Sequence, residues 1–357
     1  MAIVKLDILS VRNIHRATLL PSPSLNLITG ANASGKSSLL EAIFILGRAR
    51  SFRTANIKQA IEFEQPDLIV SAQIQQTGGH LAQLGIQINQ KHCDIHINRE
   101  SKKKSDLAYS LPLQLIHPKS YKLLDAGPQI RREFMDWGIF NHKQNFLSDW
   151  RNFKKVLLQR NSLLKSRQLK QLGVWNGKLV QYSELVTTYR QDYLRLLEPV
   201  FQQVAEHFLT NVQLQLKFLP GYDREKGLLH LLQGDLEKDL RYGYTHSGPH
   251  RSDFQLLFNQ RIAKDFVSRG QLKLLVLALK LAQVKLLNQF NNNSVCILID
   301  DLTAELDTLN KAKLLKYLAG LNCQVFMSST ELSDFGELND SIDLKVFHVE
   351  HGCIKSL

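Results

Sequence analysis

Residues 30–37 read Gly-Ala-Asn-Ala-Ser-Gly-Lys-Ser and fit the phosphate-loop (Walker A) pattern G-x-x-x-x-G-K-[ST]. Residues 25–29 before them are mostly apolar, as in a short strand, and residues 38–46 after them have the periodicity of an amphipathic helix. Glycines let the backbone turn tightly and approach phosphate oxygens, which accept N–H hydrogen bonds at a helix N-terminus. A glycine-rich turn that matches by chance is the alternative, but strand, loop and helix in this order predict a nucleoside triphosphate site.

The loop supplies most of the expected nucleotide contacts. We expect Lys36 to reach the β- and γ-phosphates and the Ser37 hydroxyl to hold Mg²⁺. The residues of this segment that are expected to bind the nucleotide are Gly30, Asn32, Ser34, Gly35, Lys36, Ser37 and Ser38.

An acidic pair follows the most apolar strand of the chain. Residues 295–299 form an uninterrupted apolar run, typical of a central parallel strand, and Asp300 and Asp301 come directly after it. A carboxylate at the end of a strand beside a phosphate loop is the Walker B arrangement, in which Asp300 holds Mg²⁺ and Asp301 polarises the attacking water. Two aspartates also open turns, so this interpretation depends on the phosphate loop.

Composition narrows the class of protein. A chain of 357 residues with 44% hydrophobic and 22% charged residues is globular, with room for one large domain or two ordinary ones. No run approaches the ~18 apolar residues of a membrane span. The four cysteines are scattered without a C-x-x-C pair, which indicates a reducing cytoplasm and no structural zinc site. The net charge of +12 suits a polyanionic partner such as nucleic acid, unless the basic surface only aids solubility.

The pattern of apolar residues changes twice along the chain. The first part has the period-two alternation of strands, whereas residues 117–212 have apolar side chains at three-, four- and seven-residue steps. This spacing predicts two or more amphipathic helices, antiparallel about a turn at residues 173–177, with a kink at Pro199 in the second. Strands then return and end in a hairpin around Phe347 and Ile354.

These changes predict an α/β fold in which a nucleotide-binding head is interrupted by a helical insertion. We place the N-terminal part of the head at residues 1–116, the helical lobe at 117–245 and the C-terminal part of the head at 246–357. The insertion is too short for a long coiled coil.

A short polar motif opens a helix between the two halves of the predicted nucleotide site. Residues 268–271 read Ser-Arg-Gly-Gln, and the helix after them is apolar on almost all sides, which predicts burial. Ser268 is a good N-cap, and the free N–H groups of such a helix start can bind an anion. An ordinary capped core helix is the alternative.

This motif resembles the signature motif of ABC-type ATPases, and Asp307 resembles their D-loop aspartate. In that family the signature serine of one subunit contacts the γ-phosphate on the phosphate loop of another. The resemblance therefore implies that Ser268, Gly270, Gln271 and Asp307 bind nucleotide in a homodimer that forms with ATP.

Over essentially its whole length the chain resembles the RecF family of bacterial recombination mediators. The most specific segments are G-P-x-x-R-R-x-F-x-D-W-G at residues 127–138 and G-P-H-R-x-D at residues 248–253. Their residue types suit a joint between lobes, a contact with DNA or ATP, or a structural turn. The other segments that carry the resemblance are residues 9–13, 30–38, 113–118, 267–283 and 299–307.

The resemblance implies a cytoplasmic ABC ATPase head that binds ATP and Mg²⁺, without membrane attachment. It implies binding to gapped DNA and to junctions of single- and double-stranded DNA, and promotion of RecA loading with RecR and RecO. These activities belong to DNA replication, recombination, repair and the SOS response. The resemblance also assigns Gln114 to the Q-loop, where it would join Asp301 in catalysis and contact Mg²⁺.

Two departures from the transporter pattern predict slow hydrolysis. The second acid is Asp301 and not glutamate, and Ser329 and Thr330 stand where transporters place a histidine. We therefore expect turnover below the typical enzyme median of about 10 s⁻¹.

Two basic clusters are candidates for DNA contacts, with solvated surface as the alternative. Phosphate contacts from such clusters give salt-sensitive binding without base readout, so recognition of a junction would depend on shape. His246, His250 and Arg251 either lie near a dimer-facing nucleotide edge or support a turn. The first cluster is Lys102, Lys103 and Lys104, and the second, on the first long helix, is Arg151, Lys154, Lys155, Arg160, Lys165, Arg167 and Lys170.

Three other classes fit less well. A transporter ATPase subunit would have Leu-Ser-Gly-Gly before its glutamine, a histidine switch and no excess of basic residues. A small kinase or GTPase would have closely spaced motifs, and a GTPase would have N-K-x-D. A catalytically idle head would not respond to changes at Lys36 or Asp300.

Overall fold

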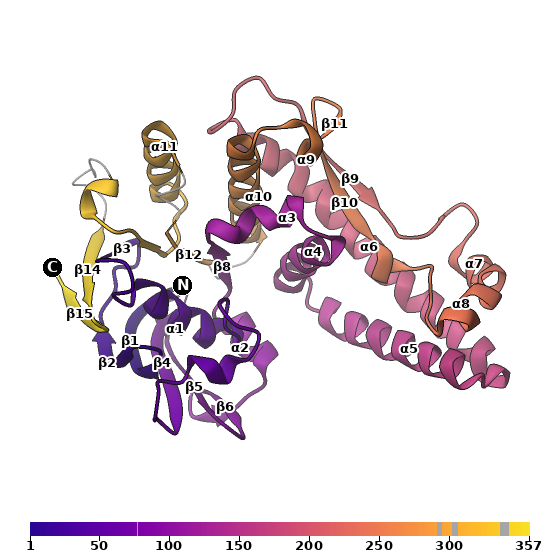
Figure 1. Cartoon of the computed structure of the whole chain (residues 1–357), viewed down its shortest axis with the longest axis horizontal. Helices are drawn as coiled ribbons and strands as arrows, with labels where there is room; N and C mark the ends of the chain where they lie inside the picture. The colour runs from indigo at the N-terminus through magenta and orange to yellow at the C-terminus, as the bar shows by residue number, and fades with distance from the viewer. Residues whose placement is uncertain (77, 291–294, 302–305, 336–342) are drawn as a thin grey trace. The chain divides into compact units, whose positions relative to one another are not determined.

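The computed structural model describes residues 1–76, 78–290, 295–301, 306–335 and 343–357. Contacts divide the chain into two compact units (Figure 1): unit 1 is Met1–Ser120 with Leu287–Leu357, and unit 2 is Tyr121–Leu286. This division agrees with a head that an insertion interrupts. The chain returns to unit 1 at Leu287, later than the predicted return at 246, and the three-part division of the chain stays a prediction.

Unit 1 contains a largely parallel sheet. Across the sheet its strands are β15 (Cys353–Ser356), β14 (Leu344–Glu350), β3 (Leu25–Thr29), β13 (Val325–Ser328), β12 (Cys296–Ile299) and β8 (Leu113–Ile116). Among these described strands only β14 and β15 pair in the antiparallel sense, and this hairpin was predicted. Strand β12 is buried throughout and has a parallel neighbour on each side, which confirms the predicted central strand.

The second sheet of unit 1 is antiparallel, and its strands lie in the early part of the chain, where the period-two alternation predicts strands. In spatial order its strands are β2 (Ile14–Leu19), β1 (Ala2–Val11), β4 (Asp67–Gln75), β5 (Leu81–Asn89), β6 (Cys93–Ile97) and β7 (Glu100–Ser101). The remaining elements of unit 1 are α1 (Lys36–Arg48), η1 (Ile57–Ala60), α2 (Lys104–Ser110), α11 (Thr308–Ala319) and η6 (Leu332–Phe335).

Helix α1 joins the two sheets through one hydrophobic core. Its apolar residues cluster with those of β1, β4 and β5 on one sheet and with those of β12 and β13 on the other. The predicted helix is present. Ten of its 13 residues are buried, so it lacks the solvent-exposed face that an amphipathic helix would have. A helix covered on two sides loses its solvent face.

Unit 2 consists of helices and one small sheet. Its sheet has the order β11-β10-β9 and is antiparallel, with β11 at Arg261–Ile262, β10 at Asp253–Phe258 and β9 at Leu214–Leu219. Helices α5 and α6 lie side by side (Figure 1). With 21 and 34 residues they do not form a long coiled coil in the described chain. The helices are α3 (Lys122–Asp125), α4 (Pro128–His142), α5 (Phe146–Ser166), η3 (Leu169–Gln171), α6 (Leu172–Ala205), α7 (Leu228–Gly234), α8 (Leu236–Tyr242), η4 (Pro249–Arg251), α9 (Ala263–Phe266) and α10 (Arg269–Phe290); η2 (Pro118–Tyr121) leads into the unit.

The predicted turn at residues 173–177 is wrong. The chain reverses earlier, where Arg167 ends α5 in the left-handed conformation with φ 57°, and α6 has already begun at Leu172. Gly173 and Gly177 therefore lie inside α6, although glycine in a helix costs about 1 kcal/mol relative to alanine. Burial of Leu172, Asn176 and Leu179 on the same turns of helix accounts for this difference.

The two most specific sequence segments meet inside unit 2 through the buried Arg131 and the half-buried Arg132. Arg131 on α4 donates to both carboxylate oxygens of Asp253, at 2.7 and 2.9 Å, and to the carbonyl of Ala126 at 2.7 Å. Arg132 donates to the carbonyl of Ser252 at 2.8 Å. These contacts fix residues 127–138 against residues 248–253, which supports the structural interpretation of both segments.

A second buried arginine reinforces this junction from α6. Arg190 forms a two-point ion pair with Asp136, with both distances 2.8 Å, and also donates to the carbonyl of Pro249 and the hydroxyl of Ser252. Gly138 allows this packing, because a Cβ at its position would lie 2.1 Å from the Tyr193 hydroxyl. The arginines and the glycine of the segment are therefore explained by helix packing.

His250 is held in the turn before β10 by only one of its two ring nitrogens among the described residues. Its Nε2–H donates to the Thr245 carbonyl at 2.8 Å, whereas its buried Nδ1 has no hydrogen-bond partner in the described chain. Burial lowers the pKa of His250 to about 4. Because the ordinary value is near 6.5, the unfolded state gains a proton first as pH falls.

We therefore expect the protein to lose stability between about pH 6.5 and pH 4 through this group. Urea unfolding at several pH values would measure the loss, and His250→Gln is expected to flatten the dependence. His230, an exposed residue of α7, provides the control substitution His230→Gln. An unchanged slope in His250→Gln would show that other groups cause the acid sensitivity.

Candidate nucleotide-binding site

The phosphate loop has the backbone that its glycines predict. It connects the end of β3 at Thr29 with the start of α1 at Lys36. Gly30 has φ 147°, and a Cβ there would lie 2.2 Å from the Val349 carbonyl oxygen. Gly35 has φ 122°, and a Cβ there would lie 3.0 Å from the Asn13 side chain. Neither position can hold a larger residue without strain.

Two residues outside the loop hold it in place, and neither was predicted from the sequence. Asn13, in the turn between β1 and β2, donates to the Ser34 carbonyl at 3.0 Å and accepts from the Ser38 hydroxyl at 2.8 Å. The backbone N–H of Gly352, in the β14–β15 turn, donates to the same carbonyl at 2.8 Å. The sequence pointed to Asn13 only through residues 9–13, one of the segments that carry the family resemblance.

The loop presents unsatisfied polar groups that suit a phosphate. The hydroxyl of Ser34 is buried without a hydrogen-bond partner among the described residues. The N-terminus of α1 has no side-chain cap within the described structure. Lys36 is buried and donates to the carbonyls of Gly30 and Ala31 at 2.7 and 2.9 Å, so its ammonium lies over the loop. These donors fit an anion at the start of α1.

Asp300 lies at the end of β12 and reaches the phosphate loop. Its Oδ1 accepts hydrogen bonds from the hydroxyls of Ser37 and Ser328, both at 2.9 Å. Burial raises the pKa of Asp300, and the negative charge of Asp301 adds to this effect, while the two hydroxyls and Arg53 oppose it. The structure therefore brings together Ser37 and Asp300, the two residues predicted to share Mg²⁺.

Asp301 adopts a conformation that is uncommon for aspartate. It has φ 47°, and its backbone N–H donates to the Ser328 hydroxyl at 3.0 Å. Burial lowers the pKa of Lys36, and the carboxylates of Asp301 and Asp300 counteract this effect. Lys36 and both acids therefore influence one another electrostatically.

Arg53 is a further cation near this site, and it was not predicted from the sequence. Its guanidinium lies 3.6 Å from the carboxylate of Glu41, which is buried in α1 and also forms a two-point ion pair with Arg12 at 2.9 Å. The hydroxyl of Ser51 accepts the backbone N–H groups of Arg53 and Thr54, which fixes the local chain. Nearly half of the Arg53 side chain stays exposed, so it is available to a bound anion.

Gln114 lies away from the level of the two acids. Strand β8 pairs with β12 so that Gln114 is opposite Ile297, and the N–H of Asp300 bonds the carbonyl of Ile116. Gln114 is therefore three strand positions before Asp300, about 10 Å along the strand. Its assignment to catalysis and to Mg²⁺ stays a prediction, and this register does not favour it.

The signature motif and the D-loop residue both cap helices. Ser268 and Gln271 form a capping box at the start of α10, because each side chain accepts the backbone N–H of the other residue, at 3.2 and 3.0 Å. Ser268, Gly270 and Gln271 are exposed. Asp307 caps α11 through the Asn310 N–H at 2.8 Å. Residues 302–305, which complete the predicted D-loop, lie outside the described residues.

The metal site predicted from the sequence needs ligands beyond the protein. No group of three or more His, Cys, Asp or Glu side chains suited to a metal occurs in the described part of the chain. Mg²⁺ commonly takes one or two protein oxygens and completes its octahedron with phosphate and water oxygens. The pair of Ser37 and Asp300 fits this kind of site.

Burial separates the basic residues of α5 that were predicted to contact DNA into two groups. Arg160 is fully buried and pairs with Asp239 at 2.7 Å, so its assignment to a DNA-binding surface is wrong. It faces the interior of unit 2, because α5 is amphipathic and position 160 shares the buried face with Phe153 and Leu164. Arg151, Lys154 and Lys155 are exposed, and Lys154 lies over the Trp150 ring. They stay candidates.

The predicted cluster in unit 1 is exposed and only partly a loop. Lys102 pairs with Glu100 at 2.7 Å, Lys103 precedes α2, and Lys104 is the first residue of that helix. The pairing removes part of the positive charge of this cluster.

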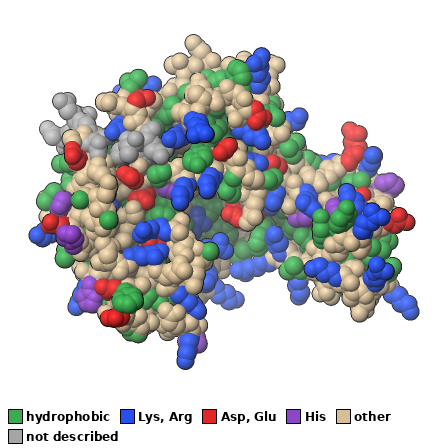
Figure 2. Space-filling model, in the orientation of Figure 1, with side chains coloured by type: hydrophobic (Ala, Val, Ile, Leu, Met, Phe, Trp, Pro, Cys, Tyr) green, Lys and Arg blue, Asp and Glu red, His purple; other side chains and the backbone are tan. Residues whose placement is uncertain are grey.

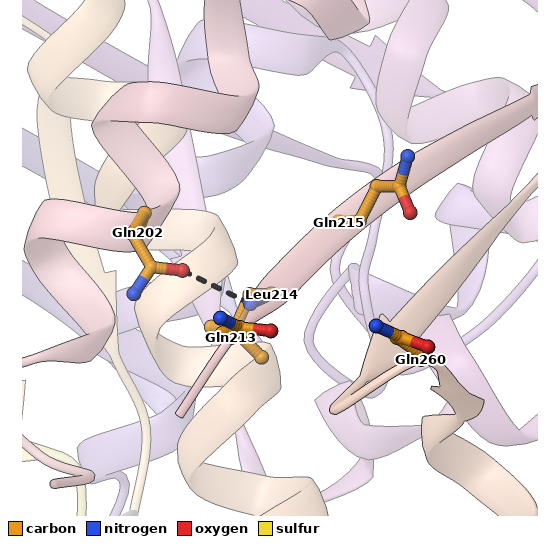
Figure 3. A pocket seen from close by; sticks show the side chains of 5 residues that line it. All are labelled: Gln202, Gln213, Leu214, Gln215 and Gln260. Carbon is orange, nitrogen blue, oxygen red and sulfur yellow. Dashed lines mark hydrogen bonds between the residues drawn. The ribbon is translucent and has the colours of Figure 1, made fainter. Parts of the chain in front are cut away.

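A separate pocket of about 350 Å³ lies in unit 2 (Figure 3). Figure 3 shows the hydrogen bond from the Leu214 N–H to the Gln202 side chain, 3.0 Å long, which occupies the outer edge of β9. The lining side chains that the structure describes are uncharged, and they include none of the predicted site residues. They are Gln202, Gln213, Leu214, Gln215 and Gln260.

Comparisons with known proteins place this fold in a class. A sequence model of the family described as "RecF/RecN/SMC N terminal domain" matches residues 2–355. A solved SMC head bound to the C-terminal winged-helix domain of ScpA has a TM-score of 0.63 at 14% identity, covering 100% of this chain and 97% of that one, which shows a shared fold. The fold and the site therefore define an ATPase head of the ABC and SMC-like class.

Full-length relatives identify the family. Proteins named DNA replication and repair protein RecF from Stutzerimonas stutzeri (strain A1501) and Azotobacter vinelandii are each 38% identical, over 100% and 99% of this chain and 98% of each relative. The solved structure of the recombination mediator protein RecF with ATP has a TM-score of 0.90 at 27% identity, covering 100% of this chain and 97% of that one. The chain belongs to the RecF family, as the sequence resemblance predicts.

No helix in the described ranges has both the length and the apolar character that crossing a membrane requires.

Proposed function

We propose that this chain is an ATP- and Mg²⁺-dependent DNA-binding ATPase of recombinational repair. The observation that carries the nucleotide part is the hydrogen bond between Ser37 and Asp300, which joins the phosphate loop to the end of β12 at 2.9 Å. Ser37 and Asp300 would hold Mg²⁺, and Lys36, Ser34 and the start of α1 would bind the phosphates. Bound Mg²⁺ would neutralise charge on the phosphate oxygens.

The DNA and protein partners rest on the family. RecF relatives are named for DNA replication and repair, and a solved RecF is described as part of the RecFOR pathway. We infer that this chain binds gapped DNA and junctions of single- and double-stranded DNA, works with RecR and RecO, and acts on RecA through them. Its net charge of +12 supports a polyanionic partner.

Exposure of the signature motif supports an ATP-induced homodimer. Helix α10 is buried over most of its length, yet Ser268, Gly270 and Gln271 at its start are exposed. In the proposed dimer these residues contact the nucleotide on the phosphate loop of a second copy. Binding of ATP between two copies would favour the dimer, and its hydrolysis would release it.

Slow hydrolysis is part of the proposal. Asp301 is the residue that would orient the attacking water. Its side chain is one methylene shorter than that of glutamate, which would place the carboxylate further from the water. Ser329 is buried at the end of β13, where transporters carry a histidine, and Thr330 follows it. Both features support turnover below about 10 s⁻¹, which suits a timer of DNA binding.

Fluorescence anisotropy of labelled gapped and blunt duplex DNA would test this function, without nucleotide and with ATP and Mg²⁺. We expect ATP to tighten binding of gapped DNA by the wild type, and Lys36→Ala to abolish this gain because the phosphates lose their buried cation. Lys355→Ala, an exposed residue of β15, is the matched control and is expected to keep the gain.

Weak binding that ATP does not change in any of these proteins would contradict the proposal. The same result would favour the idle head, and its partner would then be sought among proteins.

A further inference from the structure

An exposed cluster of aromatic rings lies at the end of α8 in unit 2. Tyr242 and Tyr244 are 57% and 39% exposed, with ring centres 6.0 Å apart. The His246 ring lies 4.4 Å from Tyr244 and 5.3 Å from Tyr242. Single exposed aromatic residues are ordinary on protein surfaces, but three rings in mutual contact form a continuous surface.

The backbone and a buried ion pair hold these rings in place. Gly243 ends α8 with φ 72°, so the two tyrosines are placed on either side of a tight turn. His246 is fixed through its Nδ1 to the Asp239 carboxylate at 2.7 Å, and Asp239 is paired with Arg160. The rings therefore stand on a rigid base, which lowers the entropy cost of binding to them.

The charge around the rings is positive. Arg251 lies over the Tyr244 ring at 5.4 Å, and the stem of Lys165 passes within 3.0 Å of the position of a Cβ on Gly243. Arg241 is exposed beside Tyr242. Figure 2 shows hydrophobic, histidine and basic side chains, with a few acidic ones between them, over the part of unit 2 that carries α7 and α8.

The acidic groups of the same elements are mostly engaged. Asp239 is buried in its ion pair, and Asp235 accepts the Ser247 hydroxyl at 2.7 Å. Glu237 and Lys238 are both exposed on α8 and oppose each other in charge. The cations near the rings are therefore left to attract an anionic partner.

We propose that this surface, consisting of Tyr242, Tyr244, Lys165, Arg241 and Arg251, is a stacking site for unpaired bases of single-stranded DNA. Aromatic rings stack on bases of any sequence, while nearby cations hold the backbone phosphates. In a blunt duplex the bases are stacked on one another and are not available to the rings. The inference rests on the proposed function, since gapped DNA supplies the single strand.

The test is anisotropy of a labelled single-stranded oligonucleotide and of a blunt duplex, with ATP and Mg²⁺. A stacked base is worth about 1–3 kcal/mol, so Tyr242→Ala is expected to weaken binding of the single strand about tenfold. Blunt duplex binding is expected to change less than about twofold. Tyr242→Phe keeps the ring and is expected to bind like the wild type.

Two further measurements separate stacking from other effects. An oligonucleotide with 2-aminopurine is expected to lose fluorescence on binding to the wild type, and to lose less with Tyr242→Ala. Phe266→Ala, which removes another exposed ring of unit 2, is the matched control and is expected to leave binding unchanged.

Several results would overturn the inference. They are equal affinity of wild type and Tyr242→Ala for the single strand, an equal loss on blunt duplex, and loss of RecR binding without loss of DNA binding. If the wild type still binds gapped DNA more tightly with ATP, only the stacking site fails. If the wild type binds no DNA with ATP, the proposed function fails as well.

Discussion

Arg160→Ala is expected to lower the free energy of unfolding of unit 2 by about 3–5 kcal/mol, because it leaves a buried carboxylate without its cation. Arg160 and Asp239 are both fully buried, and their side chains are 2.7 Å apart. The guanidinium also donates to Asn176 at 2.8 Å and to Thr245 at 2.6 Å, so several polar groups lose a partner together.

Intrinsic fluorescence can follow this change without labels. The chain has three tryptophans, Trp137, Trp150 and Trp175, and all of them belong to unit 2. Urea unfolding monitored by tryptophan emission therefore reports on unit 2. Arg151→Ala removes an exposed arginine from the same helix and is expected to change stability by less than about 0.5 kcal/mol.

A double-mutant cycle with Asp239→Ala would isolate the pair. We expect the double variant to be less destabilised than the sum of the two single variants, since removal of both partners leaves no unpaired buried charge. A decrease in the free energy of unfolding of less than about 1 kcal/mol in Arg160→Ala would contradict this prediction. It would mean that water reaches the Asp239 carboxylate and takes the place of the guanidinium.

Asp300→Asn is expected to reduce ATP turnover by at least about 100-fold, as removal of a preorganised electrostatic contact does in other active sites. The amide oxygen can still accept the hydroxyls of Ser37 and Ser328, so the local structure is expected to stay. The amide lacks the negative charge that would hold Mg²⁺. Phosphate release at saturating ATP would measure the loss.

The same substitution is expected to raise stability in the absence of nucleotide. The pKa of Asp300 in the folded protein is raised above its ordinary value of 3.8, mainly by burial. Folding therefore favours the protonated form, and stability falls as pH rises from 3.8 through the raised pKa. At neutral pH the asparagine variant no longer carries this cost, so its melting temperature should rise.

Asp94→Asn is the control for both effects, because Asp94 is exposed on β6 of the same unit. It should keep turnover and melting temperature. Wild-type turnover in Asp300→Asn would contradict the assignment of Asp300 to the metal.

Local patterns of the sequence predicted the elements around the candidate nucleotide site well. The strand at Leu25–Thr29, the loop and the start of α1 follow from contiguous residues, and so does the buried strand before Asp300. The Walker A and Walker B patterns predicted that Ser37 and Asp300 share one site, and the Ser37–Asp300 hydrogen bond brings the two residues together. Parallel strands align their C-terminal ends at one edge of the sheet, which accounts for this contact.

Errors occurred where packing overrode local preference. Gly173 and Gly177 look like a turn, but burial of the neighbouring side chains keeps them in α6. Arg160 looks like one more basic residue of α5, because nothing near it in sequence reveals Asp239 as its partner. The contact between Arg131 and Asp253 spans 122 positions, and no periodicity connects them.

The hold on the phosphate loop has a consequence for how the protein is made. A ribosome releases the loop early, whereas Gly352, which bonds the Ser34 carbonyl, emerges after the whole of unit 2. Unit 2 is continuous in sequence, so all of its residues are synthesised before the C-terminal part of unit 1. Because domains fold as units during synthesis, unit 2 can fold before unit 1 is complete. The phosphate loop gains its hydrogen bond from Gly352 only when the β14–β15 hairpin has left the ribosome. Nascent chains are therefore expected not to bind ATP until that hairpin has been translated.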